Sequence, residues 1–192
     1  MKEFLGLIAV ILGFVGFYPY FRDIFRGKTK PHLFTYLIWS IVTALAFLGQ
    51  WTSGGGPGAW TTGTMEVLTV FVLILSFKYG TEDVTKTDVV FLVVALGAII
   101  PWWLMHDPTL SVIIATIIDV CAFFPTIRKT YNDPSSETLT TWVLNILRHS
   151  LSILALTNLL LVTYIYPAAL AIMNVVVVAV IVGRKGRVKA SI

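Results

Sequence analysis

The residues of this chain that could do chemistry are a few ionisable side chains set within long apolar stretches. Glu66 and Asp119 are acidic, and Arg148 is followed directly by His149. Charged side chains are costly inside a membrane, so each is expected to face a polar pathway. An arginine stays charged, whereas a carboxylate can take up a proton. We expect Glu66, Asp119 and Arg148 to form a charge network that couples a solute to protons, or a fixed ion pair between helices, with His149 as a proton partner.

Polar and aromatic residues also follow one helical stripe in each of two apolar stretches. The second stripe, with a 3-4-3 spacing that keeps residues on one helix face, consists of Trp142, Asn145, His149 and Ser152. The first stripe consists of Tyr36, Trp39, Thr43 and Ala46. Aromatic walls with a few polar groups suit a small polar solute. We expect a substrate site lined by Trp39, Thr43, Thr62, Trp142, Asn145, His149 and Asn174. The alternative for the tryptophans and for Asn174 is packing or hydrogen bonding between helices.

The composition requires a membrane as the solvent for these stretches. The 192 residues are 57% hydrophobic and 12% charged, with a mean hydropathy of +0.85. A helix needs about 20 apolar residues to cross the hydrocarbon core. Seven stretches qualify, at about 4–21, 33–51, 59–77, 88–105, 109–127, 138–157 and 160–182. The sequence therefore predicts an all-α integral membrane protein with seven transmembrane helices.

The basic residues indicate the topology. With seven spans, the cationic residues other than Lys2 and Arg148 fall in loops and a tail on one side of the membrane. The positive-inside rule then places the N-terminus outside and the C-terminus in the cytoplasm. We expect the membrane to be the cell membrane. We expect these cations to contact anionic lipids rather than nucleic acid.

The chain contains an internal repeat. FYPYFRDIFRGKTKPHLFTYLIW, around Pro19, aligns without a gap with FFPTIRKTYNDPSSETLTTWVLN, around Pro125, at an offset of 106 residues. In each copy a proline is expected to end an apolar helix before a polar loop. Proline removes a backbone hydrogen bond, so Pro19 and Pro125 are expected to act as hinges or, alternatively, as simple helix terminators.

Two repeats of three helices with one helix between them would run parallel. The predicted divisions are residues 1–80 for the first repeat, 81–107 for a linker helix, and 108–192 for the second repeat with a basic cytoplasmic tail. The nearly uninterrupted apolar run VVFLVVALGAIIPWWLM is expected to form the linker helix.

This 3+1+3 plan resembles the SWEET sugar transporters and the wider PQ-loop family. The resemblance covers nearly the full chain and rests on the proline before a basic loop and on the third helix, TGTMEVLTVFVLILSFKY. The PQ motif is degenerate, because it reads Pro19-Tyr20 and Pro125-Thr126. The asparagines that face the sugar in that family correspond to Thr62 and Ala168. The resemblance implies transport by alternating access between two three-helix bundles.

Three functions remain open from the sequence. The first is a transporter of a small polar, sugar-like solute. The second is a proton-coupled or vitamin- or nucleoside-type carrier on the same fold, and the third is a non-transporting binding protein that resembles KDEL receptors. No nucleophile–base arrangement, metal-ligand cluster or nucleotide-binding loop is evident, so neither enzyme activity nor a cofactor or metal is expected. A monomer suffices to enclose a pathway, and association into a homo-oligomer stays open.

Overall fold

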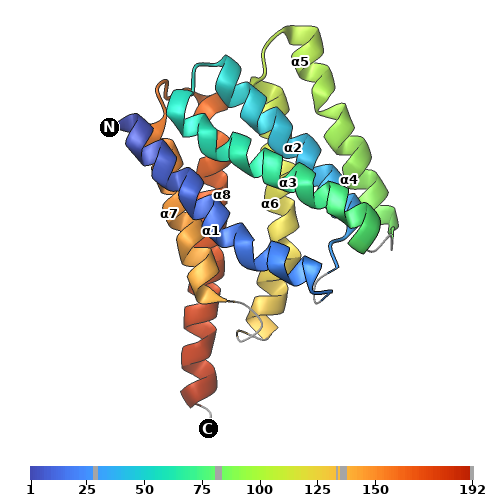
Figure 1. The fold of residues 1–192 in the computed structure, drawn as a ribbon, viewed down its shortest axis with the longest axis vertical. Coiled ribbons are helices and arrows are strands. Elements are labelled where there is room, and N and C mark those ends of the chain that lie inside the picture. Colours follow the sequence, from blue (N-terminus) through green and yellow to red (C-terminus); the bar gives the residue numbers. More distant parts are fainter. Residues whose placement is uncertain (28–29, 81–83, 133, 135–137, 191–192) are drawn as a thin grey trace.

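The computed structural model describes residues 1–27, 30–80, 84–132, 134 and 138–190, without the side chains of residues 125, 129 and 185–190. The described residues form helices joined by short loops, with no strand among them (Figure 1). The helices are α1 (Lys2–Phe25), α2 (Leu33–Thr52), the 3-10 turn η1 (Gly56–Gly58), α3 (Ala59–Tyr79), α4 (Lys86–Gly97), α5 (Ile99–Met105), α6 (Thr109–Asn132), α7 (Leu139–Ala155) and α8 (Leu161–Ala190).

The lengths of these helices indicate an integral membrane protein. Six segments of the described chain are long and apolar enough to cross a membrane, with α4 and α5 counted as one segment. The α7 helix has 17 residues, or about 25 Å at a rise of 1.5 Å per residue, which is at the lower limit for a span. The N-terminus and the C-terminus lie at opposite ends of the bundle (Figure 1).

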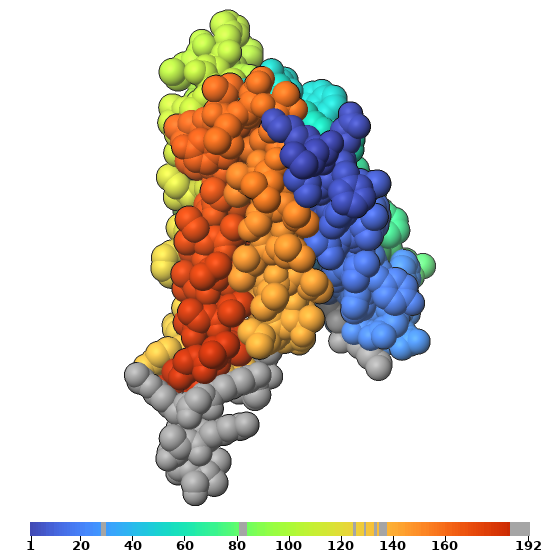
Figure 2. Space-filling model, turned by 90° about the vertical axis from the view of Figure 1, so that its left-hand side faces the viewer, coloured from blue at the N-terminus to red at the C-terminus, as the bar shows by residue number. Residues whose placement is uncertain are grey.

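The helices pack in two groups that repeat the same neighbour relations. The α3 helix packs against both α1 and α2, and α8 packs against both α6 and α7. Between the groups, α1 packs on α7 and α2 packs on α6. Figure 2 shows one of these seams, with α7 between α1 and α8 on the surface. Six helices thus form a closed ring.

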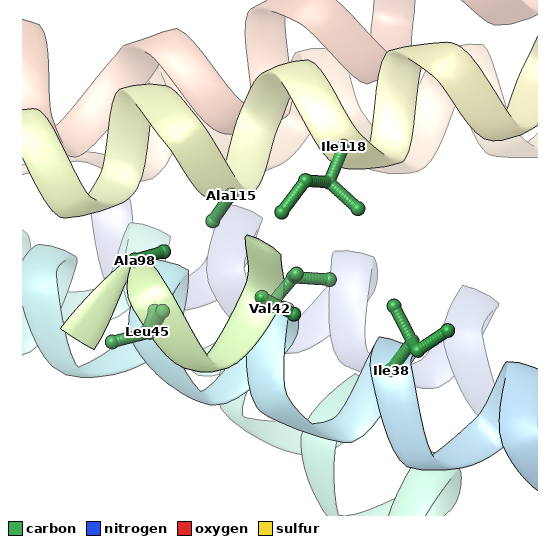
Figure 3. Close-up of a cluster of buried hydrophobic side chains, with 7 residues drawn as sticks. Ile38, Val42, Leu45, Ala98, Ala115 and Ile118 are labelled. Atoms are coloured by element: carbon green, nitrogen blue, oxygen red, sulfur yellow. The ribbon is translucent and has the colours of Figure 1, made fainter. Parts of the chain in front are cut away.

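The segment between the groups lies outside this ring, along α2 and α6 (Figure 1). It packs through small residues, because Ala95 and Ala98 meet Val42 of α2 and Ala115 of α6 in one buried cluster (Figure 3). The segment forms one candidate membrane span, Lys86–Met105, and its helix breaks at Ala98 between α4 and α5. Pro101 explains the break, because it has no N–H to donate to the carbonyl four residues earlier.

The prediction that a proline ends the first helix was wrong. Pro19 lies inside α1, which continues to Phe25. Aromatic packing holds this last part of the helix, since Phe21 contacts Phe71 and Phe25 contacts Tyr79, with ring centroids 5.4 and 6.1 Å apart. The α1 helix can therefore tolerate the hydrogen bond that proline removes.

The second copy behaves in the same way along its backbone. The α6 helix runs through position 125 to Asn132, although the side chain of Pro125 lies outside the described residues. The α8 helix is likewise longer than predicted and continues into the basic tail as far as Ala190. Near that end Arg184 Nε donates a hydrogen bond to Tyr131 O at 3.0 Å, and its guanidinium stacks on the Tyr131 ring.

Candidate functional site

The ring of six helices surrounds a cavity of about 260 Å³ whose wall carries both polar and apolar side chains. A water molecule occupies about 30 Å³ in the liquid, so the cavity has room for a small solute. All six helices of the ring contribute to its wall. The lining residues are Phe17 from α1; Trp39 and Thr43 from α2; Thr61, Thr62, Met65 and Thr69 from α3; Asp119, Ala122, Phe123 and Thr126 from α6; Trp142, Asn145, Arg148 and His149 from α7; and Tyr166, Leu170 and Asn174 from α8.

The helical stripes of the sequence explain how the wall forms. Trp39 and Thr43 are one turn apart on α2, and Trp142, Asn145 and His149 follow at spacings of three and four on α7. The structure places all seven expected substrate-lining residues in the cavity wall. Whether they bind a solute stays a prediction.

The charged residues expected to form a network do not all meet in the cavity. Asp119 and Arg148 line it, but Glu66 is not among its lining residues. Pro19, expected as a hinge, does not line it either. Glu66 is half-buried on α3, and its Oε2 has no hydrogen-bond partner. In the part of the chain that the structure describes, the only ion pair is Arg22–Asp23, near the end of α1. The expected ion pair of Arg148 with a carboxylate is therefore not formed.

Arg148 instead contacts two neutral acceptors. Its Nη1 donates to Met65 Sδ of α3, and its Nη2 lies 3.1 Å from His149 Nε2. A guanidinium has only donors, so Nε2 must be the accepting, unprotonated nitrogen and His149 is neutral here. The Nε of Arg148 is buried and has no partner.

Asp119 is held by a hydrogen-bond chain that crosses the cavity. Tyr166 of α8 donates to Asp119 Oδ2 at 2.6 Å. The Tyr166 hydroxyl also lies 3.4 Å from Thr43 Oγ1. Tyr166 has one proton, so Thr43 is the donor in that second, long contact. The chain joins α2, α8 and α6, and therefore links the two groups of helices.

Two further polar atoms in the wall lack partners. Asn174 is only 2% exposed, and its Nδ2 donates to Leu170 O at 2.6 Å, which leaves Oδ1 unpaired. Thr61 is also 2% exposed, with an unpaired Oγ1. Burying a polar group without a hydrogen bond is costly. Unpaired buried atoms of this kind are rare in native structures, so this wall departs from the usual complete pairing of buried polar groups.

Hydrogen bonds join the two groups of helices at the end of the bundle that carries the N-terminus. There the α2–α3 loop meets the end of α7, and Ser152 Oγ donates to Gly58 O at 2.7 Å. Thr157 N donates to Gly55 O at 2.9 Å, and Asn158 Nδ2 lies 3.4 Å from Ser53 O. We call these three hydrogen bonds the closing contact. They join the first group of helices to the second.

Gln50 lies along the path from the cavity to the closing contact. It follows Thr43 by seven residues, or two turns, on the same face of α2. The Gly55 N–H donates to its backbone carbonyl at 2.7 Å. Its side chain is fully buried, and neither amide atom has a partner. The polar character of the cavity therefore continues toward the closing contact.

Sequence reasoning missed several cavity residues, above all Tyr166, Thr61 and Met65. Thr61 precedes Thr62 and could have been found from the same run of small polar residues. Nothing in the sequence singles out Tyr166, because its role depends on Asp119, 47 positions earlier. Met65 reads as an ordinary apolar residue of its helix.

Metal-binding groups were also sought in the described part of the chain. No three His, Cys, Asp or Glu side chains gather there in a way that could hold a metal ion. Comparison of the chain with protein-family models, with curated proteins and with solved structures finds no match.

Proposed function

We propose that the protein is a membrane transporter that moves a small polar solute by alternating access. The observation that carries this proposal is the cavity, whose wall is shared by six helices and contains buried polar atoms without partners. In a soluble protein such a cavity would fit many roles. Within a bundle of apolar helices it fits a solute pathway, since polar groups at membrane depth are tolerated where they line a cavity.

The proposed architecture is two parallel three-helix repeats, α1–α3 and α6–α8, joined by α4 and α5. The matching neighbour relations support it, because exchanging α1 with α6, α2 with α7 and α3 with α8 reproduces the same set of contacts. A two-fold pseudo-symmetry axis gives this relation, and one linker span between two three-helix repeats would set that axis along the membrane normal. With α7 counted as a seventh span, the chain ends lie on opposite sides of the membrane, with the N-terminus outside by the positive-inside rule.

The proposed mechanism is a rocking of one repeat against the other. In the present arrangement the closing contact joins the two repeats at the end of the bundle where the N-terminus lies. Opening of the cavity to that side requires these hydrogen bonds to break while the opposite end closes. The hinge roles of Pro19 and Pro125 belong to this proposal.

The test is solute permeation into proteoliposomes, followed by light scattering. Vesicles are shrunk with a hyperosmotic solute and reswell only if it enters, so no labelled ligand is needed. The panel contains glycerol, sorbitol, glucose, ribose, glycine, glycerate and gluconate. We expect faster reswelling than in empty vesicles for at least one solute. Reswelling at the rate of empty vesicles for the whole panel would contradict transport.

A matched pair of variants ties the flux to the cavity. Asn145→Phe places a large ring in the cavity wall, whereas Leu147→Phe introduces the same ring at a position on α7 that is 47% exposed. We expect the first variant to lose permeation and the second to keep it. Binding of a panel solute without any flux would favour the receptor-like alternative.

A second candidate, proton-coupled transport, is favoured by one observation. Asp119 lies in the cavity wall without a basic partner among the described residues, and its hydrogen-bond chain reaches both repeats. A carboxylate that changes its exposure during transport can link solute movement to protons. We expect an inward proton gradient to accelerate uptake in the wild type and not in Asp119→Asn. Uptake that ignores the gradient in both proteins would exclude this coupling.

A further inference from the structure

The half-buried guanidinium of Arg148 has no counter-ion in the described chain. Its contacts are the thioether of Met65 and the neutral imidazole of His149, and its Nε has no partner at all. Moving a charge out of water costs several kcal/mol unless it is paired. Arginine cannot lower this cost by losing its proton. An anion from outside the chain would supply the missing pair.

Neither Asp119 nor Glu66, the carboxylates expected to pair with Arg148, forms an ion pair with it in the described chain. Asp119 Oδ2 accepts the hydrogen bond of Tyr166, and no ion pair joins it to Arg148. Glu66 does not line the cavity. The cavity wall around Arg148 therefore offers a positive centre to a ligand, because no described carboxylate is paired with this side chain.

The rest of the wall determines what else the ligand would carry. Asn174 Oδ1 is an unpaired acceptor, because its Nδ2 is used by Leu170 O. The hydroxyl of Thr61 is unpaired and can donate or accept. Thr62, Thr69 and Asn145 also line the cavity, and their hydroxyl and amide groups can pair with hydroxyl or amide groups of a ligand, while the rings of Trp39 and Trp142 provide apolar walls.

We propose that the solute of this cavity is a small organic carboxylate with hydroxyl or amide groups, and that Arg148 binds its carboxylate. This proposal rests on the proposed function for its claim that the ligand is transported, but not for its claim that the ligand binds. A planar guanidinium matches a carboxylate with two parallel hydrogen bonds. A phosphate dianion fits less well, because the same cavity contains Asp119 and like charges repel.

The first experiment compares matched solutes on the purified wild-type protein. Gluconate and sorbitol share a six-carbon chain of hydroxyls and differ in the carboxylate, and glycerate and glycerol form a shorter pair. A ligand of the folded state raises its stability by RT ln(1 + [L]/Kd). We expect at least one carboxylate to raise the thermal unfolding temperature with an apparent Kd at least tenfold lower than that of its neutral counterpart. Sodium chloride at the same concentration controls for ionic strength.

Three variants assign the effect to one side chain. Arg148→Gln keeps hydrogen-bond donors but removes the charge, and we expect it to weaken binding of the carboxylate at least tenfold. Arg148→Lys keeps the charge and should retain part of the binding. Arg22→Gln removes an arginine that is paired with Asp23 outside the cavity and should bind like the wild type. Each variant is compared with its own ligand-free state.

The proposal is overturned if no carboxylate stabilises the wild type, if the neutral partners bind equally well, or if a folded Arg148→Gln keeps the full effect. If Arg148→Gln fails to fold, the comparison of solutes on the wild type and the binding by Arg148→Lys still test the proposal. The permeation assay separates the two proposals. Carboxylate binding without flux would leave this inference intact and contradict transport, whereas flux of neutral solutes alone would support transport and overturn the carboxylate.

Discussion

Tyr166 and Asp119, 47 positions apart, are joined across the α6–α8 seam by a hydrogen bond of 2.6 Å. Both side chains are buried, with exposed fractions of 4% and 8%. The same hydroxyl lies 3.4 Å from Thr43 of the other helix group. This one tyrosine therefore orients the only acidic side chain among the described residues of the cavity wall and occupies one of the two carboxylate oxygens of Asp119.

Removal of the Tyr166 hydroxyl should destabilise the protein. Tyr166→Phe leaves Asp119 Oδ2 without its donor and Thr43 Oγ1 without its acceptor. Hydrogen bonds between helices within membranes contribute about 0.6 kcal/mol, and up to about 1.7 kcal/mol, so we expect a loss of about 1–2 kcal/mol in equilibrium unfolding in mixed micelles. Tyr164→Phe, at a position 37% exposed, is the control and should be neutral. Equal losses in both variants would contradict this assignment.

The closing contact should limit access to the cavity from the N-terminal end. Ser152→Ala removes the hydrogen bond to Gly58 O, with an expected loss of about 0.5–1.5 kcal/mol. A cysteine placed at Asn145 in a Cys121→Ala background should then react faster with an impermeant thiol reagent added on that side. Ser150→Ala should leave the rate unchanged. An unchanged rate in Ser152→Ala would show that other contacts keep this end closed.

The backbone of the α2–α3 loop needs glycine at two positions. Gly54 and Gly56 have φ values of 74° and 60°, a region that costs other residues roughly 1–2 kcal/mol. A Cβ at Gly56 would also collide with Thr157 of the closing contact. We expect Gly56→Ala to lose about 1–3 kcal/mol of stability. Gly16→Ala in α1 meets no atom within 4 Å and should be neutral or stabilising in the same unfolding experiment.

The hinge role of Pro19 predicts a kinetic effect rather than a loss of binding. Pro19→Ala restores an N–H inside α1 and stiffens the helix at that point. If α1 bends there during transport, the permeation rate falls several-fold while the solute affinity in thermal-shift experiments stays the same. Pro101→Ala, in the linker segment outside the ring, serves as the comparison. Unaltered permeation in Pro19→Ala would leave only the structural role of this proline.

One exposed carboxylate provides a pH test outside the membrane. Hydrogen bonds from the side chain and the backbone N–H of Thr109 hold the pKa of Asp107 below its usual value, which is about 3.9. A lowered folded-state pKa stabilises the fold above the unfolded-state value, and this contribution is lost as the pH falls through the folded-state pKa. The carboxyl carbon resonance of Asp107 should titrate below pH 3.9. A midpoint at or above that value would contradict this hydrogen-bonded arrangement.

The sequence by itself determined the properties that depend on one helix at a time. Hydrophobic length predicts where the chain can cross a membrane, and the structure confirms long apolar helices at the expected places, including α2 within two residues of its predicted bounds. The 3.6-residue period puts Trp142, Asn145 and His149 on one face before any neighbour is known. That is why the expected substrate-lining residues all reach the cavity wall.

Only the tertiary structure decided how those faces meet. The rotation and depth of each helix are set by packing against partners far away in the sequence, so the sequence could not show that Arg148 meets Met65 rather than a carboxylate, or that Glu66 stays outside the cavity. Helix ends depend on the same packing, which carries α1 past Pro19. Periodicity fixes which side chains share a helix face, whereas the partner of each side chain is fixed by side-chain packing between helices.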